Sequence, residues 1–171
     1  MKIRSGLFIV ITMGLLAFLG VTVTALEVGD SAPKLTANDQ DGKPLSFEET
    51  YKKGVTLVYF YPKADTPGCT AEACSLRDSY ADLQAKGLQV IGVSEDKAED
   101  QKKFQEKYKL PFPLVADTDG AVAKAFGVPT AGGYAKRQSF LVKDSKIAWR
   151  DLKASTEKQA TDVRAALDTL K

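Results

Sequence analysis

The chain has two cysteines, and the residue types around them can support thiol chemistry. Residues 61–74 read Tyr-Pro-Lys-Ala-Asp-Thr-Pro-Gly-Cys-Thr-Ala-Glu-Ala-Cys, so Cys69 and Cys74 stand five residues apart. A cysteine in the first turn of a helix lies beside free backbone N–H groups, which favour the nucleophilic thiolate. Thr66 can bring a hydroxyl to that thiolate or to an oxygen that it attacks. Cys69 is therefore the candidate nucleophile.

The composition excludes much of the competing chemistry. The 171 residues include no histidine, which excludes Ser-His-Asp hydrolases, Cys-His proteases, histidine-ligated zinc and haem held by a proximal histidine. Lys and Arg number 24 against 22 Asp and Glu, and Lys2 and Arg4 account for the difference. This balance argues against nucleic acid or acidic lipid as the main partner. A disulfide scaffold would need more than two cysteines.

The first 25 residues have the pattern of an export signal. A basic start precedes an apolar run over residues 7–19, and small residues at Val23 and Ala25 suit cleavage after Ala25. Residues 7–26 are also long enough to serve as an uncleaved membrane anchor. Both interpretations predict that residues 26–171 form one domain outside the cytoplasm, where disulfides persist.

Strands alternate with helices along residues 26–171, and this order must position the cysteines. The patterns predict hairpins about Asp41-Gly42 and Asp144-Ser145; strands at 55–61, 88–93 and 112–115; and helices at 70–85, 95–108, 120–126 and 156–170. Such an order indicates an α/β fold with a mixed sheet. Ligands collect at the carboxyl ends of strands in α/β sheets, and the cysteine loop follows the strand 55–61. Pro62 ends that strand and stiffens the loop.

A longer stretch around the cysteines resembles a known family. The pattern Pro62-x-x-x-Thr66-x-x-Cys69 resembles the active-site signature of the peroxiredoxins, which are thiol peroxidases of thioredoxin-like fold. The second cysteine, five residues later, makes the chain similar to the bacterioferritin comigratory protein or Q-type subfamily. Further matches in order and spacing cover about residues 28–170. The resemblance implies a thioredoxin-like α/β domain with a central mixed sheet flanked by helices and an N-terminal hairpin.

The resemblance also implies roles for individual residues. Cys69 would be the peroxidatic cysteine that reduces hydrogen peroxide or an organic hydroperoxide, and Cys74 the resolving cysteine. Thr66 would bind the peroxide, and Arg137 would lie against the thiolate, whose charge a guanidinium can stabilise. A thioredoxin-like dithiol protein would reduce the resulting disulfide. No metal, haem, flavin or nucleotide cofactor is expected, and we expect a monomer.

Three further residues are predicted to support the peroxide pocket, namely Pro62, Gly68 and Glu72. Glu72 has two interpretations: a surface acid that compensates the helix dipole, or a partner that orients Arg137. The chain departs from the family's common residues at Glu95, Ser139 and Ser145. None of these three positions lies in the cysteine loop.

The spacing of the cysteines creates a geometric conflict. Five residues along an α-helix separate two Cα atoms by roughly 8.6 Å. A disulfide needs roughly 7 Å or less. The helix that begins near Cys69 must therefore unwind locally before Cys69 and Cys74 can bond.

Two other classes of protein remain open at this point. A cell-envelope disulfide oxidoreductase would share the thioredoxin-like fold, but such enzymes carry Cys-x-x-Cys, usually after Trp, whereas the only tryptophan here is Trp149. A non-catalytic module with a stable Cys69–Cys74 disulfide would consume no peroxide.

Overall fold

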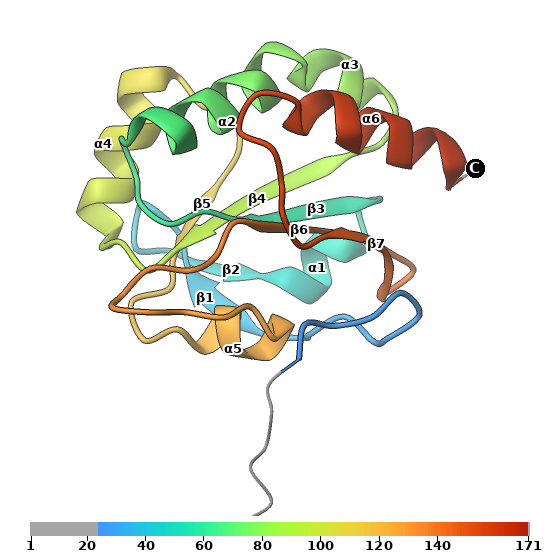
Figure 1. Cartoon of the computed structure of the whole chain (residues 1–171), viewed down its shortest axis with the longest axis horizontal. Coiled ribbons are helices and arrows are strands. Elements are labelled where there is room, and N and C mark those ends of the chain that lie inside the picture. The colour runs from blue at the N-terminus through green and yellow to red at the C-terminus, as the bar shows by residue number, and fades with distance from the viewer. Residues whose placement is uncertain (1–23, 171) are drawn as a thin grey trace, which may run out of the picture.

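A computed structural model of the chain describes residues 24–170. Its centre is a five-stranded mixed sheet in the order β5-β4-β3-β6-β7, and helices cover both faces (Figure 1). The strands are β3 (Thr56–Phe60), β4 (Gln89–Ser94), β5 (Leu114–Ala116), β6 (Gln138–Lys143) and β7 (Lys146–Asp151). The predicted α/β fold with a central mixed sheet flanked by helices is confirmed.

The N-terminal hairpin forms a small sheet of its own. Strands β1 (Thr36–Asn38) and β2 (Pro44–Ser46) pair antiparallel, and Gly42 takes a φ of 71° in the turn between them. A short helix that the sequence patterns did not predict, α1 (Phe47–Tyr51), follows directly. Ser46 begins it by accepting a hydrogen bond from the Glu49 backbone N–H.

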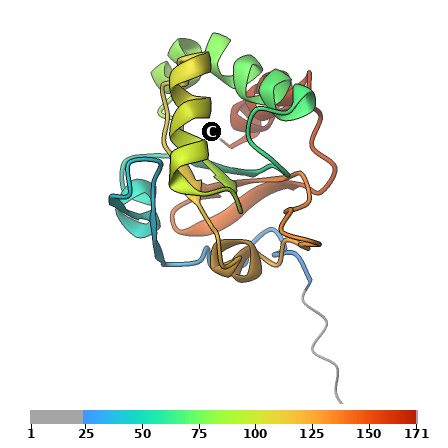
Figure 2. The ribbon, with the colours of Figure 1, turned by 90° about the vertical axis from the view of Figure 1, so that its left-hand side faces the viewer.

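The remaining helices lie in two layers. The layer on one face holds α2 (Pro67–Asp78), α3 (Tyr80–Ala85), α4 (Ala98–Tyr108) and α6 (Gln159–Thr169), and α5 (Ala121–Phe126) lies with α1 on the other (Figures 1 and 2). The single helix predicted for residues 70–85 is wrong in two respects. It begins earlier, because Pro67 suits the first helical position. It also breaks at Ser79, which ends α2 and precedes α3.

Strand β3 lies at the centre of the sheet and is buried along its whole length. Its residues alternate between two hydrophobic clusters, so Tyr59 faces the layer of α2 and α6, whereas Phe60 faces that of α1 and α5. Strand β4 pairs parallel with β3, and β6 pairs antiparallel with Gln138 opposite Phe60. Arg137, the residue before β6, therefore lies beside the carboxyl end of β3, where the cysteine loop begins.

Most of the predicted export signal or anchor lies outside the described residues, because the description begins at residue 24. Within residues 24–170, no helix is both long enough and apolar enough to span a membrane.

Candidate active site

Both cysteines lie on helix α2, as the pattern predicted, and both thiols are free. Cys69 is the third residue of the helix and only 2% exposed, and it packs in the cluster that contains Tyr59 and Tyr61 of the central sheet. Cys74 is partly exposed. Cys69 therefore lies in the core at the start of the helix, whereas Cys74 lies nearer to solvent.

Thr66 occupies the cap position at the start of α2 but does not cap the helix with its side chain. Its hydroxyl instead donates to the Lys63 carbonyl at 2.9 Å. A hydroxyl that donates in this way keeps its lone pairs free to accept a hydrogen bond from a ligand. The first-turn N–H groups of α2 donate no hydrogen bond to the Thr66 hydroxyl, which leaves them able to bind an anion beside Cys69.

Arg137 contacts the sulfur directly. Its Nη2 donates to Cys69 Sγ at 3.2 Å, and its Nη1 donates to Glu72 Oε2. The guanidinium side chain is 17% exposed, and the Glu72 side chain is fully buried. One positive charge is thus shared between a carboxyl and a thiol, and the thiolate form of Cys69 is the one it stabilises.

Glu72 uses only one of its two carboxyl oxygens in a hydrogen bond among the described residues. Its Oε1 is buried without a hydrogen-bond partner among the described residues. Burial raises the pKa of Glu72 to about 8, against the opposing effect of Arg137. Of the two interpretations of Glu72, its burial and its hydrogen bond from Arg137 support the partner that orients Arg137, because a surface acid would be exposed.

Gly68 and Pro62 shape the loop around these groups. A Cβ on Gly68 would lie 3.5 Å from Arg137 Nη2 and 3.2 Å from Thr156 Cγ2, so the glycine leaves room for the guanidinium. Pro62 follows Tyr61, whose backbone N–H donates to Val93 and makes the last sheet contact of this strand. Having no N–H, Pro62 cannot extend that pairing, and the chain turns toward Cys69.

The sequence patterns missed one neighbour of the site, Tyr59. Its hydroxyl is buried without a partner among the described residues, and burial raises its pKa well above the usual value. The charges of Glu72 and Cys69 act on it in the same direction. Its position two residues before Tyr61, on the same face of the extended chain, is the signal that could have identified it.

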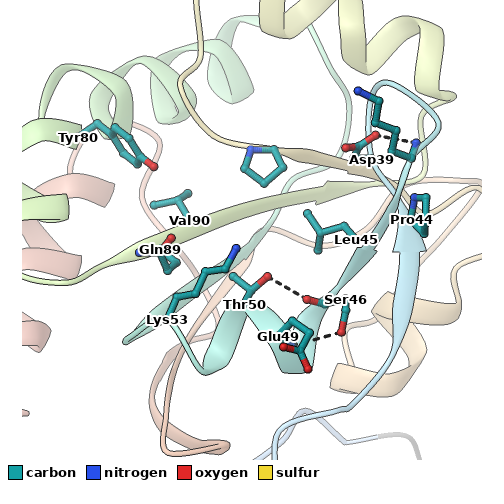
Figure 3. Close-up of a pocket in the computed structure, with 12 residues that line it drawn as sticks. Asp39, Pro44, Leu45, Ser46, Glu49, Thr50, Lys53, Tyr80, Gln89 and Val90 are labelled. Atoms are coloured by element: carbon teal, nitrogen blue, oxygen red, sulfur yellow. Dashed lines mark hydrogen bonds between the residues drawn. The ribbon is translucent and has the colours of Figure 1, made fainter.

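A separate pocket lies away from these residues. Its volume is about 390 Å³, and none of the predicted site residues lines it. The lining residues come from the N-terminal hairpin, α1, α3 and β4 (Figure 3). Within residues 24–170, no group of three potential metal-ligating side chains gathers. The cluster of Cys69, Thr66, Glu72 and Arg137 is therefore the candidate active site.

Sequence and structure comparisons find peroxiredoxins. The chain is 48% identical to peroxiredoxin Q of Oryza sativa subsp. japonica over 59% of this chain and 46% of the relative. It is 48% identical to peroxiredoxin Bcp of Escherichia coli over 60% of this chain and 65% of the relative. The chain therefore spans about half to two thirds of the length of these curated relatives. The crystal structure of peroxidoxin BcpB from Mycobacterium tuberculosis superposes with a TM-score of 0.81 at 31% identity, covering 85% of this chain and 99% of that one.

The predicted location outside the cytoplasm is wrong, because the likeness to the Bcp peroxiredoxins of Escherichia coli and Coxiella burnetii contradicts it. That prediction depended on the apolar run near the start of the chain.

A family model covers most of the described chain. The AhpC/TSA family matches residues 28–150, which include the whole cysteine loop, α2 and Arg137. The structural match to BcpB extends the likeness to the complete thioredoxin-like fold. The chain is thus a member of the AhpC/TSA family and belongs to its peroxiredoxin Q and Bcp group.

Proposed function

We propose that the chain is a thiol peroxidase that reduces hydrogen peroxide and organic hydroperoxides, with Cys69 as peroxidatic and Cys74 as resolving cysteine. The observation that carries this proposal is the 3.2 Å contact between Arg137 Nη2 and Cys69 Sγ at the start of α2. Membership of the peroxiredoxin Q and Bcp group supports the same activity.

In the first step, the Cys69 thiolate attacks one peroxide oxygen. An S–O bond forms, the O–O bond breaks, and the leaving oxygen takes a proton to become water or an alcohol. The sulfur is oxidised to a sulfenic acid. Arg137 and the first-turn N–H groups of α2 stabilise the charge that moves onto the leaving oxygen, while Thr66 accepts a hydrogen bond from the peroxide.

In the second step, the Cys74 thiolate attacks the Cys69 sulfur. An S–S bond forms, the S–O bond breaks, and hydroxide leaves and takes a proton to become water. Both cysteines lie on the continuous helix α2, on which two Cα atoms five residues apart are separated by roughly 8.6 Å. The helix must therefore unwind locally to bring the two sulfurs within bonding distance.

In the third step, a thioredoxin-like dithiol protein supplies two electrons. Its thiolate attacks the Cys69–Cys74 disulfide, a mixed disulfide forms, and its second thiol completes the exchange and restores both thiols. The disulfide oxidoreductase alternative is not favoured, because the relatives of the chain are peroxiredoxins and the two cysteines are separated by four residues.

Peroxide titration of the reduced protein tests the proposal. The wild type should consume one equivalent of peroxide and lose two hydrogens as the Cys69–Cys74 disulfide forms, as seen by mass spectrometry. Cys69→Ser should consume none. Cys74→Ser should still complete one turnover and accumulate a sulfenic acid at Cys69 that a dione probe traps. Equal loss of the first turnover in both variants would contradict the assigned roles.

A further inference from the structure

Helix α4 ends beside the cysteine loop, and its last residue contacts both flanks of the segment that carries the two cysteines (Figure 1). The Tyr108 hydroxyl donates to Asp65 Oδ1 at 2.6 Å. The Tyr108 backbone carbonyl accepts from Arg77 Nη1 at 2.8 Å. Asp65 precedes Cys69 by four residues, and Arg77 follows Cys74 by three. One residue therefore joins the start and the end of this segment.

The contact at Asp65 is reinforced by a neighbour on the same helix. Lys107 Nζ lies 2.9 and 2.8 Å from the two Asp65 carboxylate oxygens, and these contacts with Lys107 and Tyr108 hold the pKa of Asp65 below its usual value. Asp65 has a φ of 58°, a left-handed conformation that costs energy for a residue other than glycine. The loop before Cys69 thus keeps a strained conformation while α4 holds its carboxylate.

The ring of Tyr108 is itself anchored. It packs edge-on against Phe104 with ring centroids 5.3 Å apart, and Phe104 is buried against Tyr61 beside the cysteine site. A second attachment lies nearby, where the Ala64 backbone N–H donates to Asp96 Oδ2 at 2.7 Å. The packing of the Tyr108 ring against Phe104 therefore fixes the position of the hydroxyl that donates to Asp65.

We propose that Tyr108 is a positioning residue that holds the segment from Asp65 to Arg77 closed and thereby sets how a Cys69 sulfenic acid divides between two fates. This inference depends on the proposed peroxidase function. The disulfide forms only after the segment unwinds, so each contact that must break first slows resolution. Tyr108 contributes two of these contacts and reinforces the closed form from both sides.

The competing fate needs no unwinding. While the segment stays closed, the Cys69 sulfenate can attack a second peroxide molecule: a second S–O bond forms, the O–O bond breaks, and water or an alcohol leaves. The product is a sulfinic acid. The ratio of sulfinic acid to disulfide therefore measures how long the segment stays closed after the first oxidation, at a given peroxide concentration.

Three substitutions on α4 test the inference. Tyr108→Phe removes the hydroxyl but keeps the ring on Phe104 and the carbonyl on Arg77. Lys107→Gln removes the ion pair with Asp65. Lys102→Gln is the matched control, because Lys102 lies on the same helix and forms a 3.0 Å ion pair with Asp41 in the N-terminal hairpin, away from the cysteines.

The reduced variants are oxidised with a graded excess of hydrogen peroxide in the presence of a dithiol reductant, and the sulfinic acid formed per turnover is measured by mass spectrometry. We expect a decrease of roughly threefold to fivefold for Tyr108→Phe and roughly twofold for Lys107→Gln. Lys102→Gln should match the wild type. In all three variants the rate of the first oxidation should stay within about twofold of the wild-type rate, because the closed form remains the major form.

Hydrogen exchange of the reduced proteins gives a readout of opening itself. Amides of residues 70–77 should exchange faster in Tyr108→Phe than in Lys102→Gln, while β3 stays protected in both. An unchanged or increased yield of sulfinic acid in Tyr108→Phe would overturn the inference. Failure of the wild type to consume peroxide at all would instead overturn the proposed function, and the two failures are thus separate.

Discussion

Two carboxyl groups are buried in the described part of the chain, and they are held in opposite ways. Asp117 is 3% exposed, and each of its oxygens accepts a backbone N–H at 2.8 Å, from Val122 and Ala123 at the start of α5. Glu72 is fully buried, yet one of its oxygens has no partner among the described residues and the other is paired with Arg137.

The difference separates stability from reactivity. Burial raises the pKa of both carboxyl groups, but both Asp117 oxygens accept hydrogen bonds from backbone N–H groups in the first turn of α5. Glu72 is compensated by a guanidinium whose other nitrogen contacts Cys69. We infer that Asp117 serves the fold, whereas Glu72 holds a group that serves the reaction.

Arg137→Ala should have the largest effect. It removes the donor to Cys69 and leaves Glu72 unpaired, and the loss of one preorganised donor slows such steps by on the order of 10² or more. Stopped-flow measurement of the first oxidation of reduced protein is the test. The rate of the first oxidation in Arg137→Lys should lie between those of the wild type and Arg137→Ala, because lysine keeps the positive charge without the forked geometry of the guanidinium. A change below about threefold in Arg137→Ala would remove Arg137 from the mechanism.

Asp117→Ala should reverse this pattern. It leaves the backbone N–H groups of Val122 and Ala123 without an acceptor, which costs roughly 2–4 kcal/mol of unfolding free energy. The rate of the first oxidation should be unchanged. Urea unfolding measures the first quantity and stopped flow the second. Asp119→Ala is the matched control, since exposed Asp119 accepts one N–H at 3.1 Å, and it should cost less than about 1 kcal/mol.

Glu72→Gln should change how stability depends on pH. The pKa of Glu72 is about 8 in the folded protein, against an ordinary value of 4.5. Between these values the folded protein keeps a proton that the unfolded chain releases, so rising pH weakens the fold of the wild type. The variant lacks this group, while Asp117 acts equally in both proteins.

The measurement compares the unfolding free energies of the two proteins at about pH 5 and pH 8. Relative to Glu72→Gln, the wild type should lose more than about 1 kcal/mol as the pH rises across this window. A difference that stays constant with pH would mean that Glu72 is ionised throughout, and the contrast with Asp117 would then lose its electrostatic basis.

Features set by local patterns could be predicted from the sequence. The β-branched and aromatic run of 55–61, which shows no alternation, predicts a strand covered on both faces, and β3 is central and buried. The closing hairpin was placed about Asp144-Ser145, where both residues take the positive φ that a two-residue turn requires, although Ser145 stands where the family commonly has glycine. In both places the conformation depends on the residues of the segment itself and can be predicted from them.

Features set by distant contacts could not be predicted in the same way. The position of Arg137 depends on the pairing of β6 with β3, and only the family resemblance indicated it. The contact of Tyr108 with Asp65 joins polar residues 43 positions apart, for which hydrophobic periodicity carries no signal. The break at Ser79 was hidden because apolar residues continue at helical spacing on both sides of it.

Gly68→Ala should give the smallest effect and the sharpest separation of rate from stability. Alanine is favoured over glycine in a helix, so the unfolding free energy should not decrease. The added methyl group would contact Thr156 Cγ2 and Arg137 Nη2, and the first oxidation should slow by roughly threefold as the guanidinium shifts. Thr156→Ser removes the tighter of the two contacts and should restore most of the rate in the double variant, whereas Thr156→Ser alone should match the wild type.

A Gly68→Ala protein that is less stable but equally fast would show that the glycine serves packing, and the site beside Glu72 would then be built for stability as much as the site around Asp117.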